Sequence, residues 1–260
     1  MSGAGFLSID SVKNDVSTEE WHIRQELAAC YRAVAHFGWD DLIYTHITAK
    51  VPTDDGSHAF LINPLGLMFD EITASSLIKI DTDGNKLMDS PFPVNAAGFT
   101  IHSAVHQASD AAGCVIHLHT PYGIAVSNLE EGLIPTCQSA IFPWAQIAYH
   151  DYEGLAVRDD EKERLVKSLG DKNVLMLKNH GTMTVGKNIG EAFQSMYFLE
   201  FACKVQILTM SAGAKVHSMA PEAIENTIRD VMKPTAGDPS AMMWAAMMRK
   251  MERLDPSFLS

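Results

Sequence analysis

The sequence predicts an α/β domain of three layers, in which a mainly antiparallel sheet lies between two layers of helices. Helix-like and strand-like segments alternate irregularly along the chain. Several strand-like pairs are hairpin-like, and residues 81–84 (DTDG) form a turn signal after one strand. The 260 residues, 47% of them hydrophobic, suffice for one α/β core. A doubly wound parallel sheet fits this pattern less well.

The N-terminal half is predicted to hold two helices and four strands. Ser17 and Glu20 have the spacing of a capping box, and Gly38 is a plausible stop for the helix they open. Short apolar runs bounded by turn residues mark the strands. The expected helices span residues 18–36 and 99–108, and the expected strands span residues 47–51, 59–62, 77–80 and 114–119.

The C-terminal half is predicted to be richer in helix. Pro121 opens a short helix after the 114–119 strand, and a charged helix and a long apolar-faced helix follow. The expected helices span residues 123–127, 159–169, 191–210, 221–232 and 240–253, and the expected strands span residues 147–149, 174–177 and 182–185.

Composition divides the chain into three parts. Residues 1–16 read as a flexible N-terminal arm, and residues 17–232 form the main domain. Residues 233–260 read as a turn-rich linker and a Met-rich amphipathic helix. That helix covers a neighbouring subunit or the mouth of the site, or it packs on its own domain.

The charge balance of 20 − 32 = −12 argues against nucleic acid and anionic membranes as partners. No apolar run is long enough for a membrane helix, and the first ten residues lack a signal-peptide pattern. The four cysteines form no CxxC pair. We therefore expect a cytoplasmic protein whose anionic substrate needs a local positive centre.

Three histidines supply a candidate for that centre. His117 and His119 alternate with Leu118 in a predicted strand, so both side chains project from one face. His180 follows another apolar run and precedes Gly181, which permits close backbone approach. Two paired imidazoles and a third suit a catalytic divalent metal that keeps open positions for substrate. Structural histidines are the alternative interpretation.

Five motifs, in this order, resemble the class II aldolase and adducin family over about residues 20–213. They are FLINPLG at 60–66, AGFTIH at 97–102, VIHLHTP at 115–121, LKNHG at 177–181, and a segment that begins at Glu191 and ends in LEFA at 199–202. The resemblance implies the class II aldolase fold, a homotetramer, and a divalent metal on His117, His119 and His180. Zinc is our first choice, with manganese and iron as alternatives.

The sequence also departs from the sugar-phosphate aldolases of that family. Their acid/base glutamate corresponds to Gly98, which can neither bind a metal nor move a proton. Ala96 and Ala97 replace hydroxyls that would help to bind phosphate, and His46 replaces an asparagine of the phosphate loop. A phosphorylated ketose is therefore a doubtful substrate. The resemblance places Asn63, Gly66 and Gly98 at the substrate pocket.

These features favour a metal-dependent carbon–carbon lyase acting on a small anionic hydroxy- or oxo-carboxylate. Three neutral imidazoles leave a divalent ion its full charge, which suits bidentate capture of such a substrate and an enolate-like intermediate. Decarboxylation needs a proton donor and no initial base, so it tolerates Gly98 better than aldol cleavage does. The candidate donors are His46, His102, Tyr149 and His150, with His106 one turn beyond His102.

Two rivals remain open. A non-catalytic, adducin-like binding module would share the fold, although the intact histidine triad argues against it. A non-haem iron oxygenase would use the same three histidines with Fe(II) and O₂.

Overall fold

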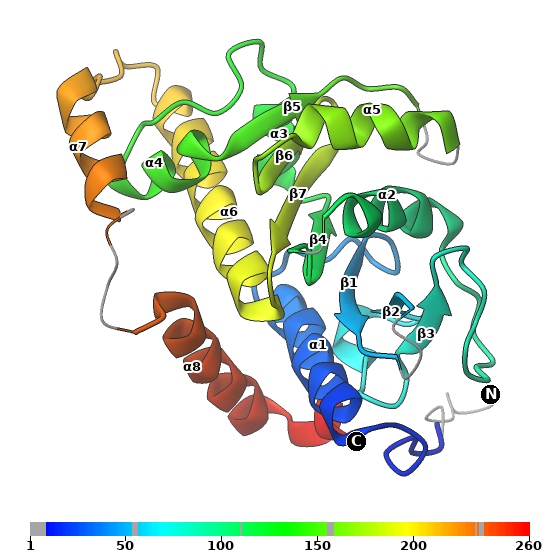
Figure 1. Cartoon of the computed structure of the whole chain (residues 1–260). Helices are drawn as coiled ribbons and strands as arrows, with labels where there is room; N and C mark the ends of the chain where they lie inside the picture. Colours follow the sequence, from blue (N-terminus) through cyan, green and yellow to red (C-terminus); the bar gives the residue numbers. More distant parts are fainter. Residues whose placement is uncertain (1–8, 54–56, 110, 155–158, 232, 234–236) are drawn as a thin grey trace, which may run out of the picture.

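The computed structural model describes residues 9–53, 57–109, 111–154, 159–231, 233 and 237–260. Within them, seven strands form one sheet in the order β3-β2-β1-β4-β7-β6-β5 (Figure 1). The strands are β1 (His46–Val51), β2 (Ala59–Ile62), β3 (Ile78–Asp81), β4 (Cys114–Leu118), β5 (Ile147–His150), β6 (Val174–Leu177) and β7 (Gly181–Gly186). Neighbouring strands are antiparallel, but β5 and β6 are parallel. The predicted mainly antiparallel sheet is confirmed.

Helices cover both faces of the sheet, which confirms the three layers (Figure 1). The apolar core on one face joins α1, α6 and α8 to side chains such as Ile116 and Leu118. The core on the other face joins α2 and α5 to Val115. The helices are α1 (Thr18–His36), α2 (Ala96–Ala108), α3 (Pro121–Ser127), α4 (Gln138–Ala145), α5 (Asp159–Leu169), α6 (Ile189–Ser211), α7 (Pro221–Val231) and α8 (Pro239–Leu254), with short 3-10 turns η1 (Phe69–Glu71) and η2 (Pro256–Leu259).

The predicted elements are confirmed to within a few residues at their ends. Helix α2 begins three residues before its predicted start, and β4 ends at Leu118, so His119 is the first residue after the strand. Helix α4 and the two 3-10 turns were not predicted. Pro143 lies inside α4 and removes a backbone donor there, so the sequence of this helix reads as a break.

The capping box predicted at the start of α1 is only half formed. The Ser17 hydroxyl accepts from the Glu20 amide at 3.1 Å. The Glu20 carboxylate accepts instead from Arg24 at 2.9 Å and from Lys79 at 2.7 Å. Both Glu20 and Arg24 are buried, so their pairing satisfies two charges where α1 meets β3.

The C-terminal helix α8 packs on its own chain. Trp244 is buried against α6, and its indole nitrogen donates to Glu26 of α1 at 3.1 Å. After α8, the amides of Ala74 and Ser75 donate to the carbonyls of Phe258 and Ser260. A role as lid or subunit interface stays a prediction, and residues 1–8 of the predicted N-terminal arm lie outside the described residues.

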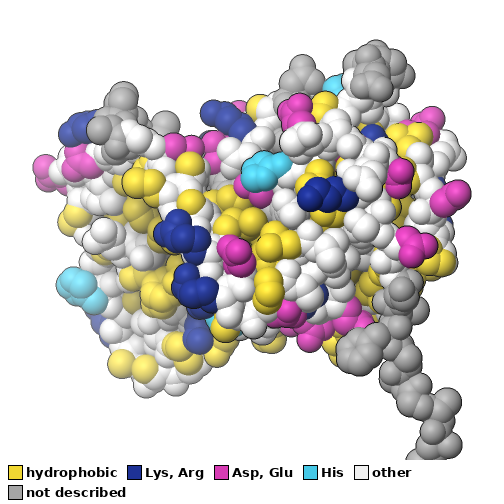
Figure 2. Space-filling model, turned by 90° about the horizontal axis from the view of Figure 1, so that it is seen from below, with side chains coloured by type: hydrophobic (Ala, Val, Ile, Leu, Met, Phe, Trp, Pro, Cys, Tyr) yellow, Lys and Arg dark blue, Asp and Glu magenta, His cyan; other side chains and the backbone are white. Residues whose placement is uncertain are grey.

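Acidic and basic side chains are interspersed on the face seen from below in Figure 2, where basic side chains border a patch of hydrophobic ones. The net charge of −12 therefore does not give this face a single sign. Among the described residues, none of the helices is both long enough and apolar enough to span a membrane.

Candidate metal centre

The sheet brings the three predicted metal ligands together. His117 lies in β4 and His119 directly after it, while His180 ends the tight turn between β6 and β7. Antiparallel pairing of β4 with β7 sets Leu118 opposite Thr182, which places the turn beside the two histidines. One possible ligand atom from each histidine lies within 4.8 Å of the other two. Among the described residues, these three histidines form the cluster that could hold a metal ion.

Hydrogen bonds donated by Nδ1 turn both Nε2 atoms of the pair toward one point. Nδ1 of His117 donates to the Thr182 carbonyl at 3.0 Å, and Nδ1 of His119 faces the Asp41 carboxylate at 3.1 Å. In neutral imidazoles with these tautomers, Nε2 carries a bare lone pair. The two Nε2 atoms are 3.0 Å apart, so their lone pairs repel unless a proton or a metal ion lies between them. The residues present therefore fit a divalent metal.

Burial favours the neutral forms of His117 and His180. His117 is 1% exposed, and desolvation holds its pKa well below the ordinary value, with the neighbouring histidines adding to the effect. Burial lowers the pKa of His180 to about 4. A metal competes with a proton for each imidazole, so low pKa values leave the lone pairs available at neutral pH.

The backbone is strained around the site. Among the described residues other than glycine, Leu42, Thr45 and Asn179 have positive φ values of 52°, 64° and 56°. Thr45 precedes His46, Asn179 precedes His180, and Leu42 follows Asp41. Such conformations cost energy and concentrate at functional sites. Their position supports a functional role for this end of the sheet.

Gly181 and the histidines pack closely, as the sequence predicted. A Cβ atom at residue 181 would lie 2.5 Å from the Leu118 carbonyl oxygen and 3.1 Å from the His119 ring. A larger residue would push the turn away from β4. Glycine at this position therefore allows His180 to approach the other two ligands.

His46 lies beside the triad. It pairs with His117 across β1 and β4, and the centroids of the two rings are 5.2 Å apart. The ring is 4% exposed, and in the described residues no side chain hydrogen-bonds to either of its nitrogens. A Cβ atom at residue 98 would lie 2.7 Å from the His46 ring. The ring thus occupies the space that a side chain at Gly98 would enter.

Beside His46, a buried chain of hydrogen bonds links Thr48 of β1 to two histidines of α2. Nδ1 of His106 lies 2.8 Å from the Ala112 carbonyl and must donate to it, so Nε2 of a neutral His106 accepts. The Thr48 hydroxyl, 2.7 Å away, then donates to His106 and accepts from Nδ1 of His102 at 2.6 Å. We assign the bare lone pair of His102 to Nε2, which has no hydrogen-bond partner in the described residues.

The two remaining donor candidates lie on different faces of the sheet. His150 pairs with Leu177 on the face of the triad, and its Nδ1 lies 3.0 Å from the Ser168 hydroxyl. The Tyr149 side chain packs in the core on the opposite face, where its hydroxyl accepts from the Leu133 amide at 3.0 Å. The structure therefore does not bring Tyr149 to the triad of its own chain. Adjacent residues in a strand point to opposite faces, which separates this pair.

Two of the predicted substrate-binding residues lie at the end of β2. Asn63 is fully buried, and its side-chain oxygen is 2.9 Å from the Tyr31 hydroxyl. Its amide nitrogen has no hydrogen-bond partner in the described residues. Gly66 is exposed with φ +111°, a conformation that glycine adopts readily.

Sequence reasoning missed two residues at the site. Asp41 faces His119, and the ring of Tyr152 lies 6.4 Å from that of His180. Tyr152 is 56% exposed and shares a small pocket with His150 and His180. No motif marks Asp41, which is 78 residues from its partner. Tyr152 could have been noticed from its position two residues after His150.

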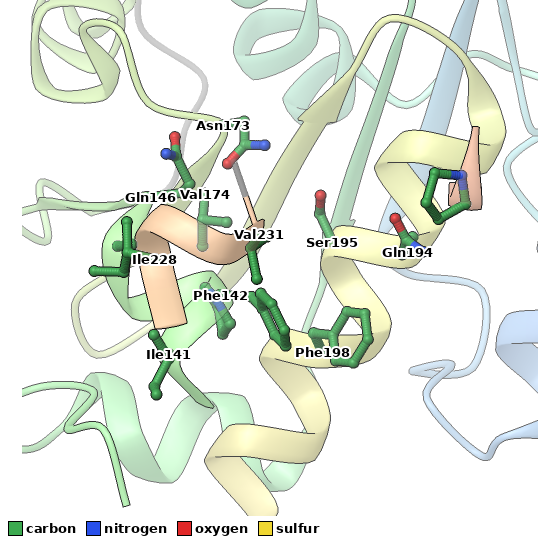
Figure 3. Close-up of a pocket in the computed structure, with 13 residues that line it drawn as sticks. Ile141, Phe142, Gln146, Asn173, Val174, Gln194, Ser195, Phe198, Ile228 and Val231 are labelled. Carbon is green, nitrogen blue, oxygen red and sulfur yellow. The ribbon is translucent and has the colours of Figure 1, made fainter. Parts of the chain in front are cut away.

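A separate apolar groove of about 420 Å³ lies between α4, α6 and α7 (Figure 3). Phe142 of α4 and Phe198 of α6 point into it beside Val231 of α7. None of the three triad histidines lines this groove, so we treat it as separate from the candidate metal centre.

Residues 25–207 match the family described as Class II Aldolase and Adducin N-terminal domain. A Caulobacter vibrioides protein provisionally named as an aldolase class 2 protein is 46% identical over 254 residues, which are 98% of each chain. Alpha-adducin of Rattus norvegicus is 43% identical over 195 residues, which are 74% of this chain and 26% of the adducin.

Solved structures share the fold. The crystal structure of an aldolase II superfamily protein from Pseudomonas syringae is 42% identical with a TM-score of 0.90, covering 96% of this chain and 100% of that one. L-fuculose 1-phosphate aldolase from Glaciozyma antarctica PI12 is 27% identical with a TM-score of 0.78, covering 96% and 94%.

Proposed function

The chain belongs to the class II aldolase and adducin family, and on that premise we propose that it is a divalent-metal-dependent carbon–carbon lyase. One observation carries this proposal. His117, His119 and His180 converge, and the Nδ1 partners of the first two leave their Nε2 atoms facing one another at 3.0 Å. A binding module would not need this arrangement.

We propose zinc as the metal, with manganese and iron as alternatives. His117, His119 and His180 would hold it, with Thr182 and Asp41 fixing the first two rings from behind. When bound, the ion would act as a Lewis acid that polarises a substrate carbonyl. Three protein ligands leave coordination positions for substrate, which is typical of catalytic rather than structural zinc sites.

The substrate class follows from the donor set. In the described residues the triad contains no carboxylate ligand, so the ion would keep its full charge toward a carboxylate with a neighbouring hydroxyl or carbonyl group. We favour decarboxylation over aldol cleavage. Gly98 offers no base, and the buried ring of His46 occupies the adjacent space. A reaction that loses CO₂ needs no base to begin.

Three side chains are proposed to act on the substrate, and a fourth positions one of them. His46 is buried beside His117, and in the described residues no side chain hydrogen-bonds to its ring nitrogens, which supports contact with an anionic substrate group. His102 holds His46 from behind, with ring centroids 4.4 Å apart. His150 and Tyr152 border the open side near His180, and Tyr152 is our candidate proton donor in place of Tyr149.

The test is the metal content of protein purified without added metal, measured by elemental mass spectrometry beside a His119→Ala variant. We expect close to one ion per chain in the wild type and a large loss in the variant. Absence of metal, even after reconstitution, would overturn the proposal. Metal-loaded protein would then be assayed with small hydroxy- and oxo-carboxylates, scoring CO₂ release against aldehyde formation.

Similarity to alpha-adducin favours a second candidate, a non-catalytic binding module. A chain that binds no metal would support it. The non-haem iron oxygenase remains a third candidate, because three histidines with open positions also suit Fe(II). Oxygen uptake with iron and substrate would separate it from a lyase, which consumes no O₂.

We also propose a homotetramer in the cytoplasm. Light scattering should give a mass about four times the 28.5 kDa of one chain, and a monomeric mass would contradict the assembly. Fractionation of the source cells tests the location.

A further inference from the structure

Glu200 is a buried acid beneath the candidate metal centre. It lies in α6 on the opposite face of the sheet from His117 and is 3% exposed. The Thr182 hydroxyl lies 3.3 Å from its Oε1 and donates to it, and the Thr120 hydroxyl also hydrogen-bonds to the carboxyl group. One side chain thus joins two segments of the chain that are 62 residues apart, 182 − 120.

The two threonines are directly connected to the metal ligands. Thr120 follows His119 and caps α3 by accepting from the Gly123 amide at 3.1 Å. The Thr182 carbonyl accepts from Nδ1 of His117, and Thr182 lies two residues after His180. A shift of either threonine would therefore move a ligand.

We propose that Glu200 is a positioning residue for all three ligands. Its carboxyl group fixes Thr120 and Thr182 from behind the sheet, which sets the spacing between the His117–His119 pair and His180. This role rests on the proposed metal site, and it adds a residue to that site that lies outside the substrate pocket.

Thr120, Thr182 and Glu200 pack tightly around Gly123, so no side chain fits at residue 123. A Cβ atom at Gly123 would lie 2.6 Å from the Thr120 hydroxyl, 2.8 Å from Cγ2 of Thr182 and 2.9 Å from Oε1 of Glu200. Removing the carboxyl group would leave a buried void and take a hydrogen-bond acceptor from both threonines. Relaxation of the two segments would then loosen the ligands.

A neutral amide at residue 200 should make the same contacts with the two threonines as the carboxyl group does. Burial is the main cause that raises the pKa of Glu200 to about 7, so its protonated form is readily reached in the folded protein. The side-chain oxygen of glutamine can accept from both threonine hydroxyls. Glu200→Gln should therefore keep the positioning contacts, whereas Glu200→Ala removes them.

Gln206 provides a matched control on the same helix. It is 1% exposed, its amide donates to the Gly132 carbonyl at 2.8 Å, and its oxygen accepts from the Ile134 amide at 2.9 Å. These contacts do not involve the histidines. Gln206→Ala should lower the melting temperature as a lost buried cross-link does, without changing the metal site.

The experiment measures Zn²⁺ affinity by competition with a chelator for the wild type, Glu200→Gln, Glu200→Ala and Gln206→Ala. We expect Glu200→Ala to lose about 10- to 100-fold in affinity, as is typical when partners of metal ligands are removed. Glu200→Gln and Gln206→Ala should remain close to the wild type. A nitrogen-detected NMR spectrum of the metal-free proteins should show the His117 Nδ1–H hydrogen bond weakened in Glu200→Ala alone.

The outcomes separate this inference from the proposed function. Wild-type affinity in Glu200→Ala would overturn the role of Glu200 and leave the metal site standing. An equal loss in Gln206→Ala would show that general destabilisation is the cause, and would also overturn it. If Glu200→Ala does not fold, loss of affinity in Glu200→Gln would count against the role. A wild-type chain that binds no Zn²⁺ would overturn both proposals.

Discussion

At the scale of single residues, hydrogen bonds to histidine decide what each ring can do. The carbonyl of Thr182 and the carboxylate of Asp41 fix the tautomers of His117 and His119 and leave their Nε2 lone pairs available for the proposed metal. In the chain of hydrogen bonds beside His46, the Ala112 carbonyl fixes the tautomer of His106, which in turn directs the Thr48 hydroxyl. The same kind of side chain is a proposed metal ligand in one place and a buried structural group in the other.

Burial of His106 predicts a pH-dependent stability. Desolvation is the main cause that lowers its pKa from 6.5 to about 3 in the folded state. Between pH 6.5 and about pH 3 the unfolded chain binds one more proton at His106 than the folded chain does. The stability contributed by neutral His106 is therefore complete above pH 6.5 and is lost as the pH falls. His106→Gln should make the fall in unfolding free energy from pH 7 to pH 5 smaller by about 2 kcal/mol.

Urea unfolding of the metal-free protein at pH 7, 6 and 5 measures this effect. The exposed His22→Gln is the control and should keep the wild-type dependence. Glu200, whose raised pKa acts in the opposite direction between 4.5 and about 7, is unchanged in both variants. Equal slopes for His106→Gln and the wild type would contradict the prediction.

At the scale of elements, pairing between distant strands builds the site. The register of β1 with β4 places His46 opposite His117, and the register of β4 with β7 places Thr182 opposite Leu118. A slip of one residue would turn the side chains of His46 and His117 to the other face of the sheet. On that other face, α8 rests against α1 and α6 and completes the core.

Trp244 tests whether α8 belongs to the domain core. Trp244 is 6% exposed. A Cβ atom at Gly190 would lie 2.8 Å from the Cβ of Trp244, so helix α6 approaches Trp244 closely. Trp244→Ala should lower the unfolding free energy by about 3–5 kcal/mol. Met242→Ala, at a position of the same helix that is 63% exposed, should change it by less than about 0.5 kcal/mol.

Denaturant unfolding measures both variants. An unchanged unfolding free energy in Trp244→Ala would mean that α8 leaves α1 and α6 in solution, as a lid or an interface segment would. The predicted lid or interface would then be the better description of residues 239–254.

At the scale of the whole molecule, the proposed metal joins distant parts of the chain. Its ligands come from β4, from the residue after β4 and from the turn before β7, and Asp41 lies in the loop before β1. A ligand that binds only the folded state stabilises the whole fold by mass action.

Zinc should therefore raise the global stability. With free Zn²⁺ at 100 times its dissociation constant, the unfolding free energy should rise by about 2.7 kcal/mol. Thermal unfolding with and without a chelator measures the change, and His119→Ala should show none of it. A similar rise in the variant would place the bound zinc elsewhere.

Much of the fold could be predicted from the sequence. Apolar periodicity, turn residues and caps placed most helices and strands, because these signals act over a few residues. Helix α4 was not predicted, because Pro143 lowers the local helix propensity. In the structure, packing of the buried Ile141 favours the helix. The three proposed ligands were predicted from their motifs. Asp41 was not, because no local pattern marks it, and Tyr152 was missed although it lies two residues after His150.

The sequence by itself determined the alternation that puts His117 and His119 on one face, and the glycine that lets His180 approach them. Only the tertiary structure decided that Tyr149 faces away from the triad, that His46 occupies the space beside Gly98, and that Glu200 lies behind the ligands. The physical reason is the distance along the chain over which each kind of interaction acts. Periodicity and turn chemistry are properties of neighbouring residues, whereas strand register and helix packing bring together groups far apart in the chain.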